Sequence, residues 1–179
     1  MERRLALWLV PEPDGESYCE WWQISSRVAS IVSPDCSPVS PHITLSLWTV
    51  PFSEPVADHI PELVPDLESP IILNTRAIST TDSFWMCIFA DVCMNDELAR
   101  ICNRTKSLGY DVNRILNRPH ASVVYSNLDP AQRQHIVSSV NSSVPDEFVA
   151  TRIVLIDTTE QDHTQWQTIE VPPNRIRRI

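Results

Sequence analysis

Apolar and polar residues follow one another along the chain in short blocks that predict a succession of strands and helices. Residues 4–10 are almost wholly apolar and predict a buried strand, which Pro11 and Pro13 end. Residues 16–32 carry apolar side chains at helical spacing, and residues 42–50 alternate as a strand does. By the same criteria we expect strands at 70–79, 84–92, 119–126, 147–158 and 165–171, and helices at 53–67, 95–108 and 130–142.

The order of these elements is strand-helix-strand-helix-strand, and the second half repeats it with one extra strand. A shift of 78 residues, from His42 to His120, also superposes Thr44 on Ser122 and gives both histidines a preceding proline. No linker divides the halves, so we expect one domain over residues 1–179. The predicted class is α+β, with two similar lobes, each a mostly antiparallel sheet with helices on the outside, facing across a central cleft.

The two repeated motifs carry the residue types of acid–base chemistry on a phosphate. Residues i and i+2 of a strand face the same way, so His42 lies beside Thr44 and His120 beside Ser122. Imidazoles titrate near neutrality, so one can take a proton while the other gives one, and hydroxyls can donate to phosphate oxygens. This equipment suits metal-independent hydrolysis of a phosphodiester. The motifs leave open which histidine is the acid and which the base.

Composition excludes several other classes of protein. There are two glycines in the whole chain, so neither a P-loop nor a dinucleotide-binding fingerprint is present. A formal net charge of −9 argues against a long nucleic-acid partner, whereas a small anionic ligand in one pocket remains possible. No apolar run reaches the length of a membrane span, and the first apolar block is a strand rather than a signal peptide. We expect an intracellular, soluble protein.

Cysteines and the other histidines add no metal or cofactor site. Five cysteines form no CxxC pair, so reduced thiols are expected rather than a disulfide framework. No HxxxH or Cys/His cluster exists, so no metal and no cofactor is expected. The remaining histidines, which belong to no repeated pattern and are expected on solvated faces, are His59, His135 and His163.

Aromatic side chains are candidates either for the core or for stacking on a nucleotide base. Three tryptophans lie on predicted strands, namely Trp8, Trp48 and Trp85. Trp48 shares the strand parity of His42. Tyr125 has the wrong parity for the cleft in a regular strand, and reaches it only through a bulge or bend.

The tetrads His42-Ile43-Thr44-Leu45 and His120-Ala121-Ser122-Val123 resemble the paired H-x-[ST] motifs of the 2H phosphoesterase superfamily. The length, the strand end Trp8-Leu9-Val10-Pro11 and the tandem layout are similar to its cyclic phosphodiesterase branch in plants and fungi. The resemblance implies opening of nucleoside 2′,3′-cyclic phosphates to 2′-phosphates. It also implies opening of ADP-ribose 1″,2″-cyclic phosphate, a by-product of tRNA splicing, to ADP-ribose 1″-phosphate.

The same resemblance implies catalytic roles for His42 and His120, and substrate-binding roles for Thr44, Ser122, Tyr125, Trp8 and Trp85. We expect a monomer whose partner is a small nucleotide cyclic phosphate, in the cytoplasm or, as in fungal relatives, associated with the Golgi. Two alternatives stay open. One is an RNA-end-processing 2H phosphoesterase acting on oligonucleotides, which the acidic balance disfavours. The other is a non-catalytic nucleotide-binding module, which has no need for two proton-transfer groups.

Overall fold

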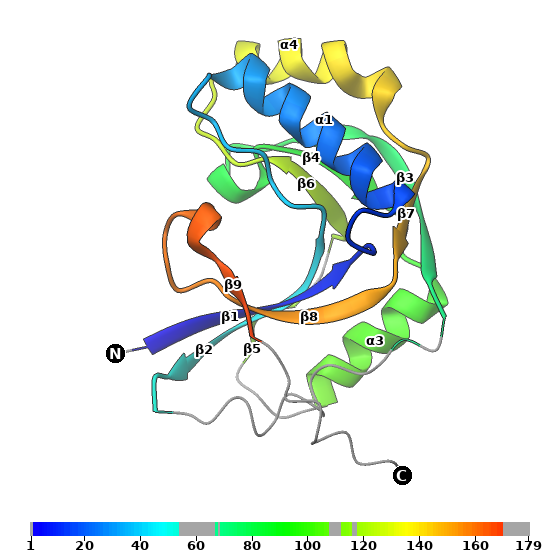
Figure 1. Ribbon diagram of the computed structural model, residues 1–179, viewed down its shortest axis with the longest axis vertical. Coiled ribbons are helices and arrows are strands. Elements are labelled where there is room, and N and C mark those ends of the chain that lie inside the picture. The colour runs from blue at the N-terminus through cyan, green and yellow to red at the C-terminus, as the bar shows by residue number, and fades with distance from the viewer. Residues whose placement is uncertain (1, 54–66, 68, 108–111, 116–117, 170–179) are drawn as a thin grey trace.

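The apolar blocks of the chain become the strands of a single sheet (Figure 1). The computed structural model describes residues 2–53, 67, 69–107, 112–115 and 118–169. In this part of the chain, nine strands are ordered β7-β3-β4-β6-β2-β1-β8-β9, with β5 paired to β2, and every pair is antiparallel. With helices packed on this sheet, the α+β class is confirmed.

The bounds of the elements are as follows. The strands are β1 (Glu2–Val10), β2 (Ile43–Pro51), β3 (Ile71–Thr80), β4 (Ile88–Val92), β5 (Val112–Ile115), β6 (His120–Val124), β7 (Glu147–Ala150), β8 (Arg152–Asp157) and β9 (Gln167–Thr168). The helices are α1 (Glu16–Val32), α3 (Asp96–Ser107) and α4 (Pro130–Val140). Single-turn 3₁₀ helices are η1 (Phe84–Met86), η2 (Asn141–Ser143) and η3 (His163–Gln165).

Two three-strand groups, β3-β4-β6 and β8-β1-β2, meet at the middle of the sheet. Their junction is one residue pair, Ile43 with Ala121, beyond which β2 leaves β6 and pairs with β5. Ala121 lies 78 residues after Ile43, so the pair sits at equivalent points of the expected repeat. This arrangement supports the repeat, while the division into two lobes stays a prediction.

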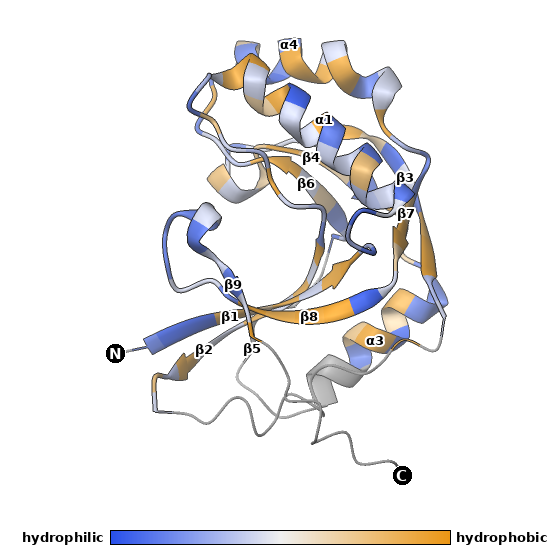
Figure 2. Ribbon diagram, viewed as in Figure 1, coloured by the Kyte–Doolittle hydropathy of each residue, from blue (hydrophilic) through white to orange (hydrophobic). Residues whose placement is uncertain are grey.

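Helices cover the outside of the curled sheet. Helices α1 and α4 lie side by side, α1 against β6 and α4 against β3, and α3 lies at the opposite end of the molecule near β2 and β5 (Figure 1). Helix α4 begins where Asp129 and Gln132 form a reciprocal capping box and Pro130 opens the first turn. Figure 2 shows mixed hydropathy along these helices and a mostly hydrophobic β8, as expected for elements with one buried face.

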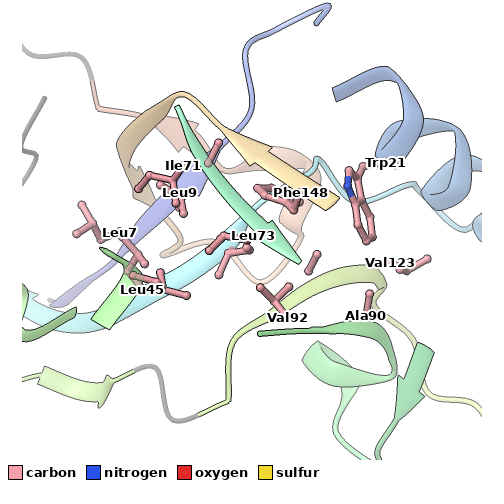
Figure 3. Close-up of a cluster of buried hydrophobic side chains, with 14 of the residues drawn as sticks. Leu7, Leu9, Trp21, Leu45, Ile71, Leu73, Ala90, Val92, Val123 and Phe148 are labelled. Carbon is pink, nitrogen blue, oxygen red and sulfur yellow. The ribbon is translucent and has the colours of Figure 1, made fainter. Parts of the chain in front are cut away.

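The core forms where side chains of β1, β2, β3, β4, β6 and β7 meet those of α1 (Figure 3). Its residues are largely aliphatic and no more than a few per cent exposed; among them are Leu7, Leu9, Trp21, Leu45, Ile71, Leu73, Val92, Val123 and Phe148. Because β1 and β2 contribute their inward-facing residues to this core, their other face is left to form the wall of a cavity.

Strands β2 and β6 each contain a β-bulge at the equivalent point, and beyond it the side chains of the strand point to the other face of the sheet. Opposite β1, the register shifts so that Leu45 is the extra residue of β2. Opposite β4, it shifts so that Val123 is the extra residue of β6. After its bulge β2 turns Trp48 opposite Leu5 on the core side, where Trp48 is 3% exposed. The expectation that Trp48 shares the parity of His42 is therefore wrong.

Several predicted strands differ from the observed ones. The predicted strand 147–158 is two strands, β7 at one end of the sheet order and β8 next to the strand at the other end. Between them the N–H of Thr151 donates to the carbonyl of Val10, at 2.9 Å. The last strand is shorter than the predicted 165–171, because η3 takes up its first residue. The predicted helix 53–67 falls almost wholly outside the described residues.

The start of the predicted strand 84–92 is also wrong, because a 3₁₀ turn replaces it. The hydroxyl of Thr81 donates to the carbonyl of Met86 at 2.8 Å, and the N–H of Met86 donates to the carbonyl of Ser83 at 3.0 Å. These local hydrogen bonds compete with the ladder. They place Trp85 in η1 rather than on β4.

A test of how the site is anchored comes from Ser25, which ties α1 to β6. Its buried hydroxyl donates to the carbonyl of Val123 at 2.9 Å and accepts from the N–H of Val39 at 2.6 Å. Ser25→Ala should lower the free energy of unfolding by about 1–3 kcal/mol, because two buried backbone groups lose their partner. Urea unfolding measures the loss.

The matched control is Ser30→Ala, whose exposed hydroxyl bonds only to the carbonyl of Ser26 within α1. Equal stability of the two variants would contradict this role for Ser25.

Candidate functional site

A cavity of about 340 Å³ opens where β2 and β6 diverge. Its size is within the range of small-ligand sites. The polar side chains of its wall include Thr44 from β2 and His120 and Ser122 from β6. Trp8, Trp85 and Tyr125 line it as well, so six of the seven sequence-predicted site residues border one cavity.

The junction pair explains how the two motifs come together. Ile43 is 0% exposed and Ala121 1% exposed, so the apolar residue of each motif points into the core. Antiparallel pairing about Ile43 and Ala121 sets His42 opposite Ser122, and Thr44 opposite His120. All four polar side chains therefore leave the sheet on the same face.

Both imidazoles are held by the same backbone hydrogen bond. His42 Nδ1 lies 2.7 Å from the carbonyl oxygen of Ser40, and His120 Nδ1 lies 2.8 Å from that of Arg118. A carbonyl oxygen can only accept, so Nδ1 donates in each ring. The carbonyl two residues earlier thus fixes tautomer and orientation in both motifs, and it leaves Nε2 for proton transfer.

Aromatic rings enclose His42. The ring is 2% exposed, Trp8 stacks on it at a centroid distance of 3.7 Å, and the hydroxyl of Tyr125 lies 3.1 Å from Nε2. Burial lowers the pKa of His42 to about 4; the Ser40 hydrogen bond opposes this, and the charges of His120 and His163 add to it. Trp8 and Tyr125 line the cavity on this side, with His42 behind them.

His120 has a more polar environment. It is half-buried, and its ring meets Phe89 edge-on at 5.1 Å. Its cross-strand neighbour is Asp91, which Arg118 holds in a two-pronged pair at 2.6 and 2.8 Å. Burial would raise the pKa of Asp91, but hydrogen bonds from Arg118 and Ser79 outweigh it, and His120 also lowers it. The carboxylate therefore stays ionised beside His120.

The aromatic neighbours of the two histidines occupy matching places. Trp8 pairs with Thr44 across β1 and β2, and Phe89 pairs with Ser122 across β4 and β6. The counterpart of Trp8 is therefore Phe89, not Trp85 or the Met86 that the 78-residue shift indicates. The three-residue offset arises because η1 interrupts the second half just before β4.

Hydrogen bonds around Tyr125 run in one direction. Burial raises the pKa of its phenol, while a hydrogen bond from Ser122 opposes the rise. The phenol is therefore protonated, and it donates to Nε2 of neutral His42, which in turn donates from Nδ1 to Ser40. Ser122, Tyr125, His42 and Ser40 form a chain in which each donor has an acceptor.

Two residues beside the site were missed by the sequence analysis. Trp166 stacks on Trp85 at 5.3 Å, and His163 meets the ring of Tyr125 edge-on at 5.2 Å. The expectation that His163 lies on a solvated face is wrong. The repeat indicates that His163 is the counterpart of Trp85, because the two residues are 78 positions apart. The β3–β4 and β8–β9 hairpins that hold them also match in register under the same shift.

The charged side chains that line the cavity are basic, and one of them, Arg118, is paired with Asp91 beside it. Arg4, Arg118 and His120 line the cavity, and its described lining contains no carboxylate. Elsewhere, no disulfide joins the five cysteines, all of which are described. No three metal-binding side chains gather within the described ranges. No helix of the described chain is long and apolar enough to cross a membrane.

Comparisons with known proteins give little further guidance. No protein-family model and no curated protein matches the sequence. Among solved structures, the chain is similar to Usb1 of Kluyveromyces marxianus, with 14% identity and a TM-score of 0.45 over 94% of this chain and 98% of that chain. A likeness at this level assigns neither family nor activity.

The buried, neutral His42 predicts a specific pH dependence of stability. Its folded-state pKa of about 4 is below its ordinary value of 6.5, so unfolding takes up a proton between these values. The stability contributed by the neutral ring is complete above pH 6.5 and falls as the pH drops towards 4, by at most about 3 kcal/mol.

Urea unfolding between pH 7 and pH 4 tests this. His42→Gln, which has no titrating ring, should lose less stability over that interval than the wild type. Parallel curves for the two proteins would contradict the assignment.

Proposed function

We propose that the protein is a metal-independent phosphodiesterase of the 2H type that opens nucleoside 2′,3′-cyclic phosphates to 2′-phosphates. The observation that carries the proposal is the antiparallel pairing of the two H-x-[ST] motifs. That pairing directs His42, Thr44, His120 and Ser122 to one face, and each imidazole is fixed by the same Nδ1 hydrogen bond.

The reaction needs one proton acceptor and one proton donor across a phosphate. The oxygen of water attacks phosphorus as one histidine takes its proton. The bond from phosphorus to the 3′ oxygen breaks, and the other histidine protonates that oxygen. The products are a 2′-phosphate monoester and a 3′ hydroxyl. Thr44 donates to one non-bridging oxygen, and the hydroxyl of Ser122, which bonds to Tyr125 in the free protein, turns to donate to the other, where negative charge grows in the transition state.

The two environments support an assignment of acid and base. His42 is neutral because burial lowers its pKa to about 4, so it can accept a proton at Nε2 once the hydroxyl of Tyr125 no longer donates there. His120 lies opposite the ionised Asp91, and a carboxylate beside an imidazole stabilises its protonated form. We therefore infer that His42 is the base and His120 the acid.

The charge of the cavity supports an anionic substrate of limited size. Arg4 and Arg118 face a cavity of about 340 Å³ within a chain of net charge −9. The positive wall is local, so a small cyclic phosphate fits better than a long polynucleotide, whose backbone needs many basic contacts.

Hydrolysis of adenosine 2′,3′-cyclic phosphate with EDTA present tests the proposal. The wild type should release adenosine 2′-phosphate, and His42→Ala and His120→Ala should each lose most single-turnover activity. The double variant should be far less impaired than the product of the two single losses, because the two groups act as a unit.

The matched control is His135→Ala, an exposed position on α4 that should keep wild-type turnover. Near-wild-type turnover by either single catalytic variant would overturn the two-histidine mechanism. Hydrolysis of oligonucleotide ends with no turnover of the mononucleotide would favour the RNA-processing alternative.

The hydroxyls give a separate test of transition-state stabilisation. Thr44→Val and Ser122→Ala each remove one donor and should lower kcat by roughly 10²–10³, by analogy with oxyanion-hole donors. Thr44→Ser and Ser122→Thr keep the hydroxyl and should retain most of the rate. If the valine and serine variants at position 44 have the same kcat, Thr44 has a structural role alone.

A further inference from the structure

The cavity that holds the reacting groups extends well beyond them along β1 and β2. Thr44 lies at one end of this wall, opposite Trp8 on the neighbouring strand, and Arg4 lies at the other end, opposite Thr49. Arg4 and Trp8 are four residues apart on one strand, so about 13 Å separates them along it. Alternate residues of a strand face the same way, so both side chains are on the cavity side of β1. The wall is therefore longer than a single phosphate group needs.

The stretch of wall between these two ends is apolar. Its floor is formed by Ala6 of β1 and Leu47 of β2, which are cross-strand neighbours. The basic residues of the described lining are Arg4 at one end, and Arg118 and His120 at the other. A ligand that spans the cavity thus meets polar groups at its two ends and apolar side chains between them.

The two arginines of the lining differ in whether a carboxylate neutralises them. Arg118 forms a two-pronged ion pair with Asp91, at 2.6 and 2.8 Å. Arg4 forms an ion pair with no carboxylate of the described residues, although the chain has 23 acidic residues against 14 basic ones. The cation that is left without a counter-charge in this cavity is therefore at the end away from the reacting groups.

Hydrogen bonds to the chain after β8 hold Arg4 at that end. Its backbone N–H donates to the hydroxyl of Thr159 at 3.0 Å, and its carbonyl accepts from the N–H of Thr158 at 2.8 Å. In its side chain, Nη2 donates to the carbonyl of Thr159 at 3.1 Å, and the described residues provide no other acceptor for the guanidinium. A guanidinium has five N–H groups in a planar fork that matches the oxygens of a phosphate. Because the side chain is exposed, a ligand can reach the remaining donors.

The phosphate that reacts is not the partner of Arg4, because it binds beside Thr44 at the other end of the wall. In a nucleoside 2′,3′-cyclic phosphate, the cyclic phosphate and the 5′ carbon are on opposite sides of the ribose. With the cyclic phosphate at the histidines and the ribose along the apolar stretch, the 5′ oxygen points towards Arg4. A phosphate on that oxygen would supply the missing negative charge.

We propose that Arg4 forms a second anion subsite, which binds a phosphate group on the 5′ oxygen of the substrate. The proposal rests on the phosphodiesterase function proposed above. The shared chemistry is a phosphate at this position, either a terminal one or one that links the nucleotide to a further group. Arg4 thereby determines specificity and takes no part in the proton transfers.

Two substrates that differ only in the second phosphate test this subsite. One is adenosine 2′,3′-cyclic phosphate, and the other is the same compound with a 5′-phosphate. The wild type should have a roughly five- to fiftyfold higher kcat/KM for the 5′-phosphorylated substrate, mainly through a lower KM, because charge-assisted hydrogen bonds form with it alone. Arg4→Gln should lose this gain and should turn over the substrate without the 5′-phosphate as the wild type does.

The matched control is Arg100→Gln, which removes the same charge from an exposed position on α3 outside the described lining. It should keep the full gain. Circular dichroism confirms that each variant is folded. Equal kcat/KM for the two substrates in the wild type, or an undiminished gain in Arg4→Gln, would overturn the subsite and leave the proposed function standing.

A dinucleotide that ends in a 2′,3′-cyclic phosphate distinguishes the two sources of the second phosphate. Its 5′ phosphate is a diester to the preceding nucleoside. An Arg4-dependent gain that is larger for the dinucleotide supports a subsite for a linking phosphate. A gain that is larger for the 5′-phosphorylated mononucleotide supports a subsite for a terminal phosphate.

Calorimetric titration separates the subsite from catalysis if no substrate is turned over. The probes are adenosine 2′-phosphate and adenosine 2′,5′-bisphosphate. Tighter binding of the bisphosphate by the wild type and by Arg100→Gln, lost in Arg4→Gln, supports the subsite even though the proposed function has failed. Equal affinity for the two probes, or no binding of either, overturns the subsite.

Discussion

The site depends on a single backbone pairing, that of Ile43 with Ala121. Around this pair, antiparallel geometry gives each histidine the hydroxyl residue of the other motif as its cross-strand neighbour. A slip of one residue in either strand would turn the histidine of that strand into the core and its apolar neighbour into the cavity. Complete burial of Ile43 and near-complete burial of Ala121 oppose that slip, so core packing maintains the register on which the chemistry depends.

A symmetric backbone carries an asymmetric pair of histidines, because the side chains around them differ. Trp8 stacks flat on His42, whereas Phe89 meets His120 with its edge. The hydroxyl of Tyr125 bonds to Nε2 of His42, whereas an ion pair of Arg118 and Asp91 lies near His120. In the proposed reaction, one imidazole is the base and the other is the acid. The surrounding residues provide that difference without disturbing the shared Nδ1 hydrogen bonds.

Much of the fold could be predicted because hydrophobic periodicity encodes it directly. Helix α1 and strands β1 and β2 lie within a residue or two of their predicted ranges, and both motifs were found from spacing alone. Periodicity does not encode a bulge, so the sequence analysis missed the rotation of Trp48 into the core. For the same reason it could place Tyr125 in the cleft only on the assumption of a bulge, which the structure has at Val123. Nor does periodicity encode a hydrogen bond from a side chain that stabilises a turn, such as the bond from Thr81 to the carbonyl of Met86, which places Trp85 in η1 rather than on a strand.

His163 and Trp166 escaped prediction for a different reason, since neither lies in a motif. They reach the site because β9 folds back on β8, and the short hairpin loop between these strands lies against Tyr125. The other hairpin, β3–β4, brings Trp85 to the same ring, at 5.1 Å. Tyr125 is thus in contact with both loops, and its hydroxyl bonds to Nε2 of His42. A substrate that approaches Nε2 of His42 must take the place of this hydroxyl, so under the proposed mechanism His42 meets its substrate only when Tyr125 is displaced.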